Sequence, residues 1–496
     1  MLGRVSGVRV AVVGGGISGL AAAWFLRQSL GPDAEIVVLE KQPVVGGHLR
    51  VSEVAGLPVD EGAESLLARR PEAVDLAVAV GLGDDIVHPA AVGAGLWSRG
   101  EIVPLPVGTV MGVPADPARL AGLLTPSEVA RAEALDARGD AGLPVAEDVA
   151  IGRLVRSRYG DAVADRLVEP LLGGVYAGRA DELSLDATVP ALGAAARTAR
   201  TLREAVATVT SGGAAGNGPG RGSGTPASSG GATSGGPGPV FAGLAGGVGR
   251  LPGAVAVASR ADVRTGVTVR SVERTADGWR LVTGPVPAPS VLDVDAVVVA
   301  TPAVAAARVL ASAAPAAAAE LGGVEAASMA IVTLALPADG FPAAPSSSGF
   351  LVPPIDGRTI KAVTFSSAKW PWLGGRAGGL VLLRASLGRH GEARDLQRDD
   401  GELVEAALAD VRAATGYAGS VVDSRVTRWG GALPQYAVGH LDRVARVRAA
   451  VEAVPGLAVC GAVYDGVGVA ACVGAARDAA GRVAAYLSER RARIET

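Results

Sequence analysis

Residues 8–40 read VRVAVVGGGISGLAAAWFLRQSLGPDAEIVVLE, and this stretch decides the fold. Apolar runs at Val8–Val13 and Glu35–Leu39 predict two strands, and the pattern of Leu20–Leu30 between them predicts a helix. A strand, a tight glycine turn, a helix and a second strand in succession are typical of α/β proteins with a parallel sheet. We therefore expect an α/β fold.

The turn itself predicts a bound dinucleotide. Gly14 permits the tight turn, Gly16 lets a pyrophosphate approach the backbone, and Gly19 lets the helix pack closely on the strand. The first helical turn offers unpaired N–H groups to the phosphates. Glu40 follows Gly19 by 21 residues, where its carboxylate can accept hydrogen bonds from an adenosine ribose.

Further glycines favour FAD over a nicotinamide cofactor. Gly46–Gly47 allows a second close backbone approach just after the second strand. A late glycine loop, Gly461 with Gly466 and Gly468, precedes a helix predicted over Val473–Leu487. A flavin held in a domain built from distant segments explains both features. None of the three lysines has a tyrosine four residues before it, which excludes the YxxxK pair of short-chain dehydrogenases.

The composition sets limits on the class of protein. Of 496 residues, 49% are hydrophobic and 19% charged, which excludes a largely disordered chain and suits a multi-domain enzyme. A net charge of −3 gives no electrostatic footprint for nucleic acid. Two cysteines, Cys460 and Cys472, are too few for a disulfide framework, and four widely separated histidines predict no metal site.

Other segments differ in their pattern. Pro71–Arg200 is rich in helical patterning, including a helix predicted over Ala146–Tyr159. Ser211–Pro239 is dominated by Gly, Ser and Pro, which predicts a disordered linker with no catalytic role. Further strands are predicted at Val267–Val272, Trp279–Val282, Val291–Ala300 and Leu457–Val459.

These segments predict a discontinuous domain organisation. We expect a FAD-binding domain at 1–75, 240–302 and 440–496, a helical lobe with part of the substrate domain at 76–205, a disordered insertion at 206–239, and a substrate-binding domain at 303–439. The uncharged run Val10–Leu26 is too short for a comfortable membrane span. We expect a soluble cytoplasmic protein whose surface can touch a membrane.

Six further short motifs are distributed over nearly the whole length of the chain. They are VDEGAESLLARRP (Val59–Pro71), WSRGEIVPLP (Trp97–Pro106), VEPLLGGVYAGRADELSL (Val168–Leu185), GFLVP (Gly349–Pro353), RWGGALPQYAVGHL (Arg428–Leu441) and GAVYDGVGVAAC (Gly461–Cys472). With GGGISG, this set resembles the oxygen-dependent porphyrinogen oxidase family of haem biosynthesis, within the amine-oxidase-like FAD superfamily. The resemblance implies a Rossmann-like, p-hydroxybenzoate-hydroxylase-like FAD domain, a substrate domain with a mixed sheet, and an inserted helical lobe.

The resemblance also implies which residues contact FAD. Carried over by motif, they are Gly14, Gly15, Gly16, Ile17, Ser18, Gly19, Glu40, Lys41, Gly47, Gly62, Ala63, Glu64, Ser65, Val269, Trp429, Val467, Gly468 and Val469. The chain departs from the family at Val44, where arginine is usual, and at GAESL, where the family has GPDSF. The flavin carries the chemistry in this family, so no catalytic side chain is expected.

The substrate pocket should combine flat apolar walls with cations for the propionates of a tetrapyrrole. Gly349–Val352, with Gly349 and Leu351, and Leu382–Leu387 are the candidate walls, and ordinary core strands are the alternative reading. Arg70 is the first candidate for a propionate partner, and a solvated surface arginine is its alternative. Lys361, Lys369 and Arg384 are weaker candidates.

The implied reaction removes six electrons and six protons from a porphyrinogen in three rounds of hydride transfer to FAD, with dioxygen reduced to hydrogen peroxide. Such hydride removal needs positioning more than a dedicated acid or base. Only three of 46 cationic residues are lysine, as in proteins of high-GC bacterial genomes. On that ground we favour coproporphyrinogen III, with four propionates, over protoporphyrinogen IX, with two.

Two other functions stay open. An amine oxidase or a carotenoid-desaturase-like flavoprotein would show bleaching of the flavin by a polyamine or a polyene. A non-catalytic carrier with a flavin fold would bind porphyrin tightly without holding stoichiometric FAD.

Overall fold

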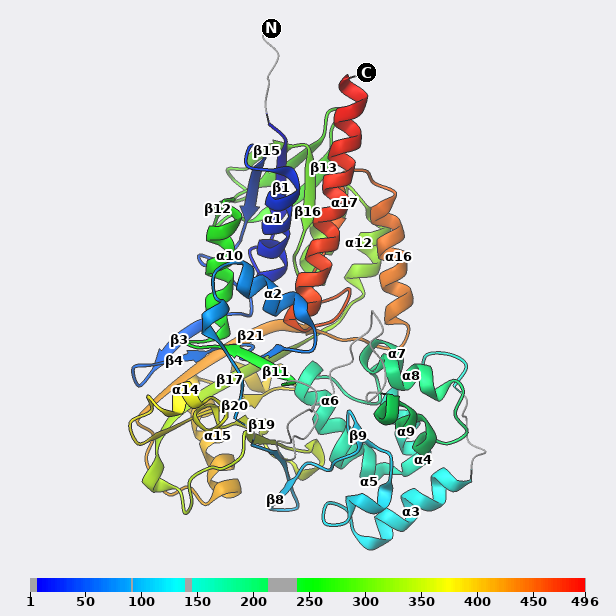
Figure 1. The fold of residues 1–496 in the computed structure, drawn as a ribbon, viewed down its shortest axis with the longest axis vertical. Coiled ribbons are helices and arrows are strands. Elements are labelled where there is room, and N and C mark those ends of the chain that lie inside the picture. The colour runs from blue at the N-terminus through cyan, green and yellow to red at the C-terminus, as the bar shows by residue number, and fades with distance from the viewer. Residues whose placement is uncertain (1–6, 91, 139–144, 213–238, 496) are drawn as a thin grey trace.

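The computed structural model describes residues 7–90, 92–138, 145–212 and 239–495. Three regions can be followed in Figure 1: a parallel sheet with its helices, a large mixed sheet, and a group of short helices. The mixed α/β class expected from the sequence is confirmed.

A five-stranded sheet forms the first region, and every neighbouring pair of its strands is parallel. Its strands are apolar runs because both faces of the sheet are covered by helices. They come from three separated parts of the chain, so distant segments meet in one sheet. The spatial order is β12 (Asp262–Arg264), β2 (Glu35–Leu39), β1 (Arg9–Val13), β16 (Ala296–Val299) and β22 (Leu457–Val459).

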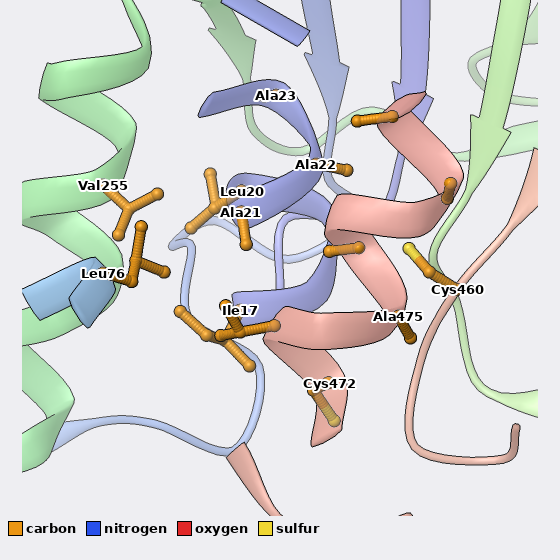
Figure 2. Packing of buried hydrophobic residues seen from close by; sticks show 14 of the residues in the cluster. Ile17, Leu20, Ala21, Ala22, Ala23, Leu76, Val255, Cys460, Cys472 and Ala475 are labelled. Atoms are coloured by element: carbon orange, nitrogen blue, oxygen red, sulfur yellow. The ribbon is translucent and has the colours of Figure 1, made fainter. Parts of the chain in front are cut away.

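Seven helices pack on this sheet. On one face, α1 lies between α17 and α10, and α2 packs against α17 and α10; Leu20, Leu76 and Val255 meet there (Figure 2). On the other face, α11, α12 and α16 cover Val297 and Val299. The helices are α1 (Ile17–Leu30), α2 (Pro71–Ala79), α10 (Leu251–Ser259), α11 (Ala303–Leu310), α12 (Pro315–Gly322), α16 (His440–Glu452) and α17 (Val469–Glu495).

Two expected domain boundaries cut through structure that packs as one. The boundary at 75/76 falls inside α2, and Leu82 beyond it still belongs to the hydrophobic cluster of the parallel sheet. The boundary at 302/303 separates α11 and α12 from the same sheet, although Leu310 and Leu321 pack on it. The motifs marked the strands of this region but not the helices that cover it.

A seven-stranded sheet forms the second region, antiparallel throughout except for the parallel pair β18 and β7. The helix α15 (Asp400–Thr415) covers one face, where Leu403 and Ala407 pack against Val332 and Leu383. The strand order is β21 (Asp423–Pro434), β17 (Ala326–Pro337), β20 (Leu380–Leu387), β19 (Ile360–Thr364), β18 (Gly349–Leu351), β7 (Ala94–Ser98) and β8 (Glu101–Pro104).

Short helices form the third region, at the lower right of Figure 1. They are α3 (Pro126–Ala137), α4 (Ile151–Tyr159), α5 (Asp161–Val163), α6 (Glu169–Tyr176), α7 (Leu185–Thr188), α8 (Pro190–Ala196) and α9 (Leu202–Gly212). The helix predicted from Ala146 begins at Ile151, because Ala150 forms a β-bridge with Ser184 and Asp148 accepts a hydrogen bond from the same serine.

Part of the predicted disordered insertion is helical instead. Residues 206–212 belong to α9, because Val206 is buried in the core of the helical region. Residues 213–238 lie outside the described part of the chain. The last helix, α17, extends beyond the predicted Val473–Leu487 at both ends.

The predicted strand Val291–Ala300 is two strands in different sheets. Its first half is β15, in a three-stranded antiparallel sheet, and its second half is β16 of the parallel sheet. Asp295 lies between them and accepts a hydrogen bond from the Arg9 amide at 2.8 Å, which marks the change of sheet. The antiparallel sheet contains β13 (Val269–Arg274), β14 (Trp279–Thr283) and β15 (Ser290–Val294).

Several short elements complete the described chain. They are the paired strands β3 (Val51–Val54) and β4 (Leu57–Asp60), β9 (Thr109–Val110) and β10 (Val113–Pro114), the sheet of β5 (Leu66–Leu67), β11 (Phe241–Leu244) and β6 (Ile86–Val87), and the helices α13 (Ser366–Lys369) and α14 (Pro371–Gly374). In the described ranges, no helix combines the length and apolar character needed to cross a membrane.

Candidate functional site

The first glycine turn has the geometry that a close ligand approach requires. Gly14 has a φ of +111°, a backbone conformation that favours glycine. A Cβ atom on Gly19 would collide with the Gly14 carbonyl, so α1 can approach β1 only because this position is glycine. Gly16 precedes α1 and makes no side-chain cap, which leaves the first helical N–H groups to an outside acceptor.

The second glycine segment lies against the first. The Gly46 amide donates to the Gly15 carbonyl at 2.8 Å, and Gly16 and Gly46 form a parallel β-bridge. A Cβ atom on Gly47 would lie 3.2 Å from the Gly16 Cα, so the two backbones are in near contact. The sequence predicted such a second approach at this place.

Glu40 lies at the end of β2, beside the first turn. One of its carboxylate oxygens accepts from the Gly15 amide at 2.6 Å and the other from the Gln42 amide at 2.7 Å. The Val267 amide donates to the Glu40 carbonyl at 2.8 Å, which brings the start of β13 and Val269 toward this end of the sheet. Lys41 is exposed to solvent next to them.

The late glycine loop meets the first turn from the other end of the chain. The Cys460 thiol contacts the Ser18 carbonyl at 3.8 Å. Ile17 at the start of α1 and Cys472 in the first turns of α17 belong to one hydrophobic cluster, as Figure 2 shows. Since α17 begins directly after Gly468, the N-termini of both helices open at the same edge of the sheet.

A third turn, Gly62–Ser65, joins the same place. A Cβ atom on Gly62 would collide with the His48 carbonyl, to which the Ala63 amide also donates. The Trp429 ring lies edge-on against the His48 ring, 5.1 Å between centroids, and its indole N–H donates to the Glu61 carbonyl at 2.8 Å. Burial lowers the pKa of His48.

The Glu64 carboxylate of this turn pairs with two cations of the protein. Lys369 Nζ lies 2.6 Å from one carboxylate oxygen and Arg384 Nη1 lies 2.8 Å from the other. Burial alone would raise the pKa of Glu64, but the two cations outweigh it and lower the pKa to about 2. Lys369 and Arg384, two of the weaker propionate candidates, therefore each share an ion pair with Glu64.

Two aromatic side chains that the sequence did not single out hold the late glycine loop. The Tyr436 hydroxyl donates to the Ala462 carbonyl, and His440 Nε2 lies 2.9 Å from the Val463 carbonyl. Their rings are stacked with centroids 4.0 Å apart. Burial lowers the pKa of His440 to about 4, so the ring is neutral and donates through Nε2–H. Nothing in the sequence pattern pairs these residues with the loop.

The expected substrate residues are spread over two regions. Arg70 precedes α2 and pairs with Glu72 at 2.9 Å, near the first turns of α17. Gly349 and Leu351 lie in β18. A Cβ atom on Gly349 would collide with the Val363 carbonyl, so this glycine is required by strand packing. Leu351 packs toward Gly174 of α6.

Lys361 is buried in β19, and its ammonium nitrogen has no hydrogen-bond partner among the described residues. Over the same residues, no group of three or more metal-ligating side chains gathers.

The residues brought together fit a flavin dinucleotide. Three glycine turns, two helix N-termini and an acidic side chain at the end of β2 meet at one edge of a parallel sheet, where a dinucleotide binds in open α/β folds. The close approach of Gly16 and Gly47 leaves backbone without side chains at the point where phosphates would lie.

Comparisons with known proteins agree with this geometry. A family model described as flavin containing amine oxidoreductase matches residues 17–484. The coproporphyrinogen III oxidase of Mycobacterium tuberculosis (strain ATCC 25618 / H37Rv) is 39% identical over 469 residues, 94% of this chain and 95% of that protein.

Solved structures give the same picture. A crystal structure from Exiguobacterium sp. 255-15, provisionally named a protoporphyrinogen oxidase, has a TM-score of 0.81 at 30% identity and covers 97% of this chain and 99% of that one. Cyclohexylamine oxidase from Brevibacterium oxydans IH-35A has a TM-score of 0.67 at 18% identity, over 97% of this chain and all (100%) of that one, which shows a shared fold.

Proposed function

Because the chain belongs to the flavin-containing amine oxidoreductase family, we propose that it is an FAD-dependent coproporphyrinogen III oxidase of haem biosynthesis. The similarity to the mycobacterial coproporphyrinogen III oxidase extends over nearly the whole of both chains, and this observation carries the proposal. The meeting of the glycine turns at one sheet edge supports the cofactor independently.

We infer that the five-stranded sheet and its helices form a p-hydroxybenzoate-hydroxylase-like FAD-binding unit. The N-terminal turns of α1 and α17 would donate N–H groups to the pyrophosphate. Each carboxylate oxygen of Glu40 accepts one internal hydrogen bond and keeps a lone pair for a ribose hydroxyl. Val269 would lie beside the adenine, and Trp429 with Val467–Val469 would lie near the flavin ring.

The overall reaction removes six electrons and six protons from the porphyrinogen. We infer that three molecules of dioxygen accept them and leave as three molecules of hydrogen peroxide, which balances the atoms and the electrons. When bound, FAD supplies the two-electron chemistry of hydride removal. The chain's own residues bind and orient the reactants and exclude water.

The substrate would lie between the flavin turns and the sheet face that carries Leu351 and Arg384. Leu351 offers an apolar wall there, opposite α6. Arg70 is our candidate for a propionate partner, because its guanidinium is partly exposed and Glu72 occupies only part of its donors. Soluble cytoplasmic action with contact to a membrane surface is part of the same proposal.

An aerobic assay of both porphyrinogens tests the substrate. We expect the purified, FAD-loaded protein to convert coproporphyrinogen III to fluorescent porphyrin with three peroxides per turnover, and faster than protoporphyrinogen IX. A tenfold preference for protoporphyrinogen IX, about 1.4 kcal/mol in transition-state terms, would reverse the assignment. Tight binding of coproporphyrin by a colourless protein with no turnover would instead indicate a carrier.

A further inference from the structure

Three ionisable side chains from distant parts of the chain meet behind the Gly62–Ser65 turn. Glu64 belongs to the turn, Lys369 ends α13 and Arg384 lies in β20. Besides the two ion pairs, the Ser366 hydroxyl lies 3.1 Å from a Glu64 oxygen. The exposed fractions of the three charged side chains are only 11%, 17% and 8%. We call these four residues the Glu64 cluster.

The two cations of the cluster also bind the turn itself. Lys369 Nζ donates to the Ser65 hydroxyl at 2.9 Å, and Arg384 Nη2 donates to the Gly62 carbonyl. The turn is therefore held at both of its ends, by Lys369 from α13 and by Arg384 from β20. Each cation makes one bond to the Glu64 carboxylate and one bond to the turn, so the carboxylate fixes the position of both.

The cluster combines positional and electrostatic effects. Ion pairs that are largely removed from solvent are screened little, so their charges act over several ångströms. Asp60 lies in the same field, with a pKa that burial raises to about 6, and accepts from the Val248 and Gly249 amides. The cluster therefore contains one carboxylate that stays ionised, that of Glu64, between two cations directly behind the proposed flavin turn.

We propose that Glu64 is a positioning residue that fixes the flavin turn through Lys369 and Arg384 and thereby sets the affinity and the reduction potential of bound FAD. The proposal rests on the proposed FAD function. The two oxygens of the Glu64 carboxylate reach one cation each from this turn.

Two substitutions at Glu64 separate charge from position. Glu64→Gln keeps the shape but removes the anion, so the two cations carry an uncompensated positive charge beside the flavin. Since reduction adds negative charge to the flavin, we expect its midpoint potential to rise and the dissociation constant of FAD to increase at least tenfold. Glu64→Asp keeps the charge but shortens the side chain by one methylene, so FAD affinity should fall with a smaller change of potential.

The measurements are FAD titration of the apoprotein, redox titration of the reconstituted protein, and the melting temperature of the apoprotein. Glu128→Gln is the matched control, because it breaks the ion pair at 2.7 Å between Glu128 in α3 of the helical region and Arg99 in the turn between β7 and β8. That variant should keep the FAD dissociation constant and the potential of the wild type. Arg384→Lys keeps the cation and shortens its reach, and it should weaken FAD binding even if Glu64→Gln does not fold.

The proposal would be overturned if the Glu64 and Arg384 variants kept the FAD affinity and the reduction potential of the wild type, whether or not their melting temperature fell. The cluster would then have a purely structural role. Neither readout uses a porphyrinogen. Failure of the wild type to oxidise coproporphyrinogen III would therefore count against the proposed function and not against the cluster.

Discussion

Replacing Lys361 by methionine should stabilise the protein, whereas the same substitution at Lys369 should destabilise it. Both lysines lie in or next to the seven-stranded sheet, and both are largely buried. They differ in their partners. Lys361 Nζ has no hydrogen-bond partner among the described residues, and Arg389 adds a like charge near it, whereas Lys369 Nζ contacts Glu64 and Ser65.

The size of the effect follows from the pKa of Lys361. Burial, and then the like charge of Arg389, lower this pKa from 10.5 to about 7. The difference of about 3.5 corresponds to nearly 5 kcal/mol, at about 1.4 kcal/mol for each pKa unit. Because pH 7 is close to this lowered pKa, neutral Lys361 is populated in the folded state, which reduces the cost of folding with Lys361 to roughly 4 kcal/mol.

The free-energy cost of burying Lys361 depends on pH in the opposite sense to the stabilisation by a lysine that gains an anionic partner on folding. Because the pKa is lower in the folded state, the cost is absent above pH 10.5, grows as the pH falls from 10.5 to 7, and is constant below 7. Methionine has a similar length and no charge, so Lys361→Met should raise the free energy of unfolding at pH 7 by about 2–4 kcal/mol. The gain should shrink as the pH approaches 10.5.

The assay is thermal and urea unfolding of the wild type and both variants at pH 7, 9 and 10.5. Lys369→Met leaves Glu64 with only one cation in a buried place, so it should lose about 3–5 kcal/mol. Equal or lower stability of Lys361→Met at pH 7, or a gain that does not change with pH, would refute the reasoning and indicate that Lys361 has an anionic ligand.

Three further predictions concern the candidate site. Gly19→Ala should abolish FAD binding, because its Cβ would collide with the preceding turn, while Gly253→Ala in α10 meets open space and should bind FAD normally; FAD content checks both. Burial lowers the pKa of His440 to about 4, so protonation of His440 should reduce the free energy of unfolding by about 3 kcal/mol as the pH falls from 6.5 to 4. A His440→Gln variant whose melting temperature has the same pH profile as that of the wild type would contradict this. Burial raises the pKa of both Cys460 and Cys472, that of Cys472 to about 11. At pH 8 both should therefore react with a thiol reagent at least 100-fold more slowly in the folded than in the unfolded protein. Rapid labelling of the native protein would show that the first turn of α17 opens.

One part of the fold, residues 8–40, could be predicted from the sequence alone. The strand, turn, helix and strand of residues 8–40 form through contacts between near neighbours, and the glycine positions state directly where backbone must approach backbone or ligand. For that reason β1, β2, the turn at Gly14 and the place of Glu40 were predicted nearly to the residue. The second glycine pair followed from the same rule, because Gly46–Gly47 comes shortly after β2 and forms a bridge with the first turn.

Only the tertiary structure decided which distant side chains meet at these turns. The motif predicted Glu64 as a cofactor contact, but it gave no sign of its partners Lys369 and Arg384, which lie 305 and 320 residues away along the chain. Tyr436 was likewise paired with the late glycine loop only by folding. Periodicity and spacing describe a chain over a few turns of structure, whereas ion pairs and ring stacks form wherever folding brings groups within a few ångströms.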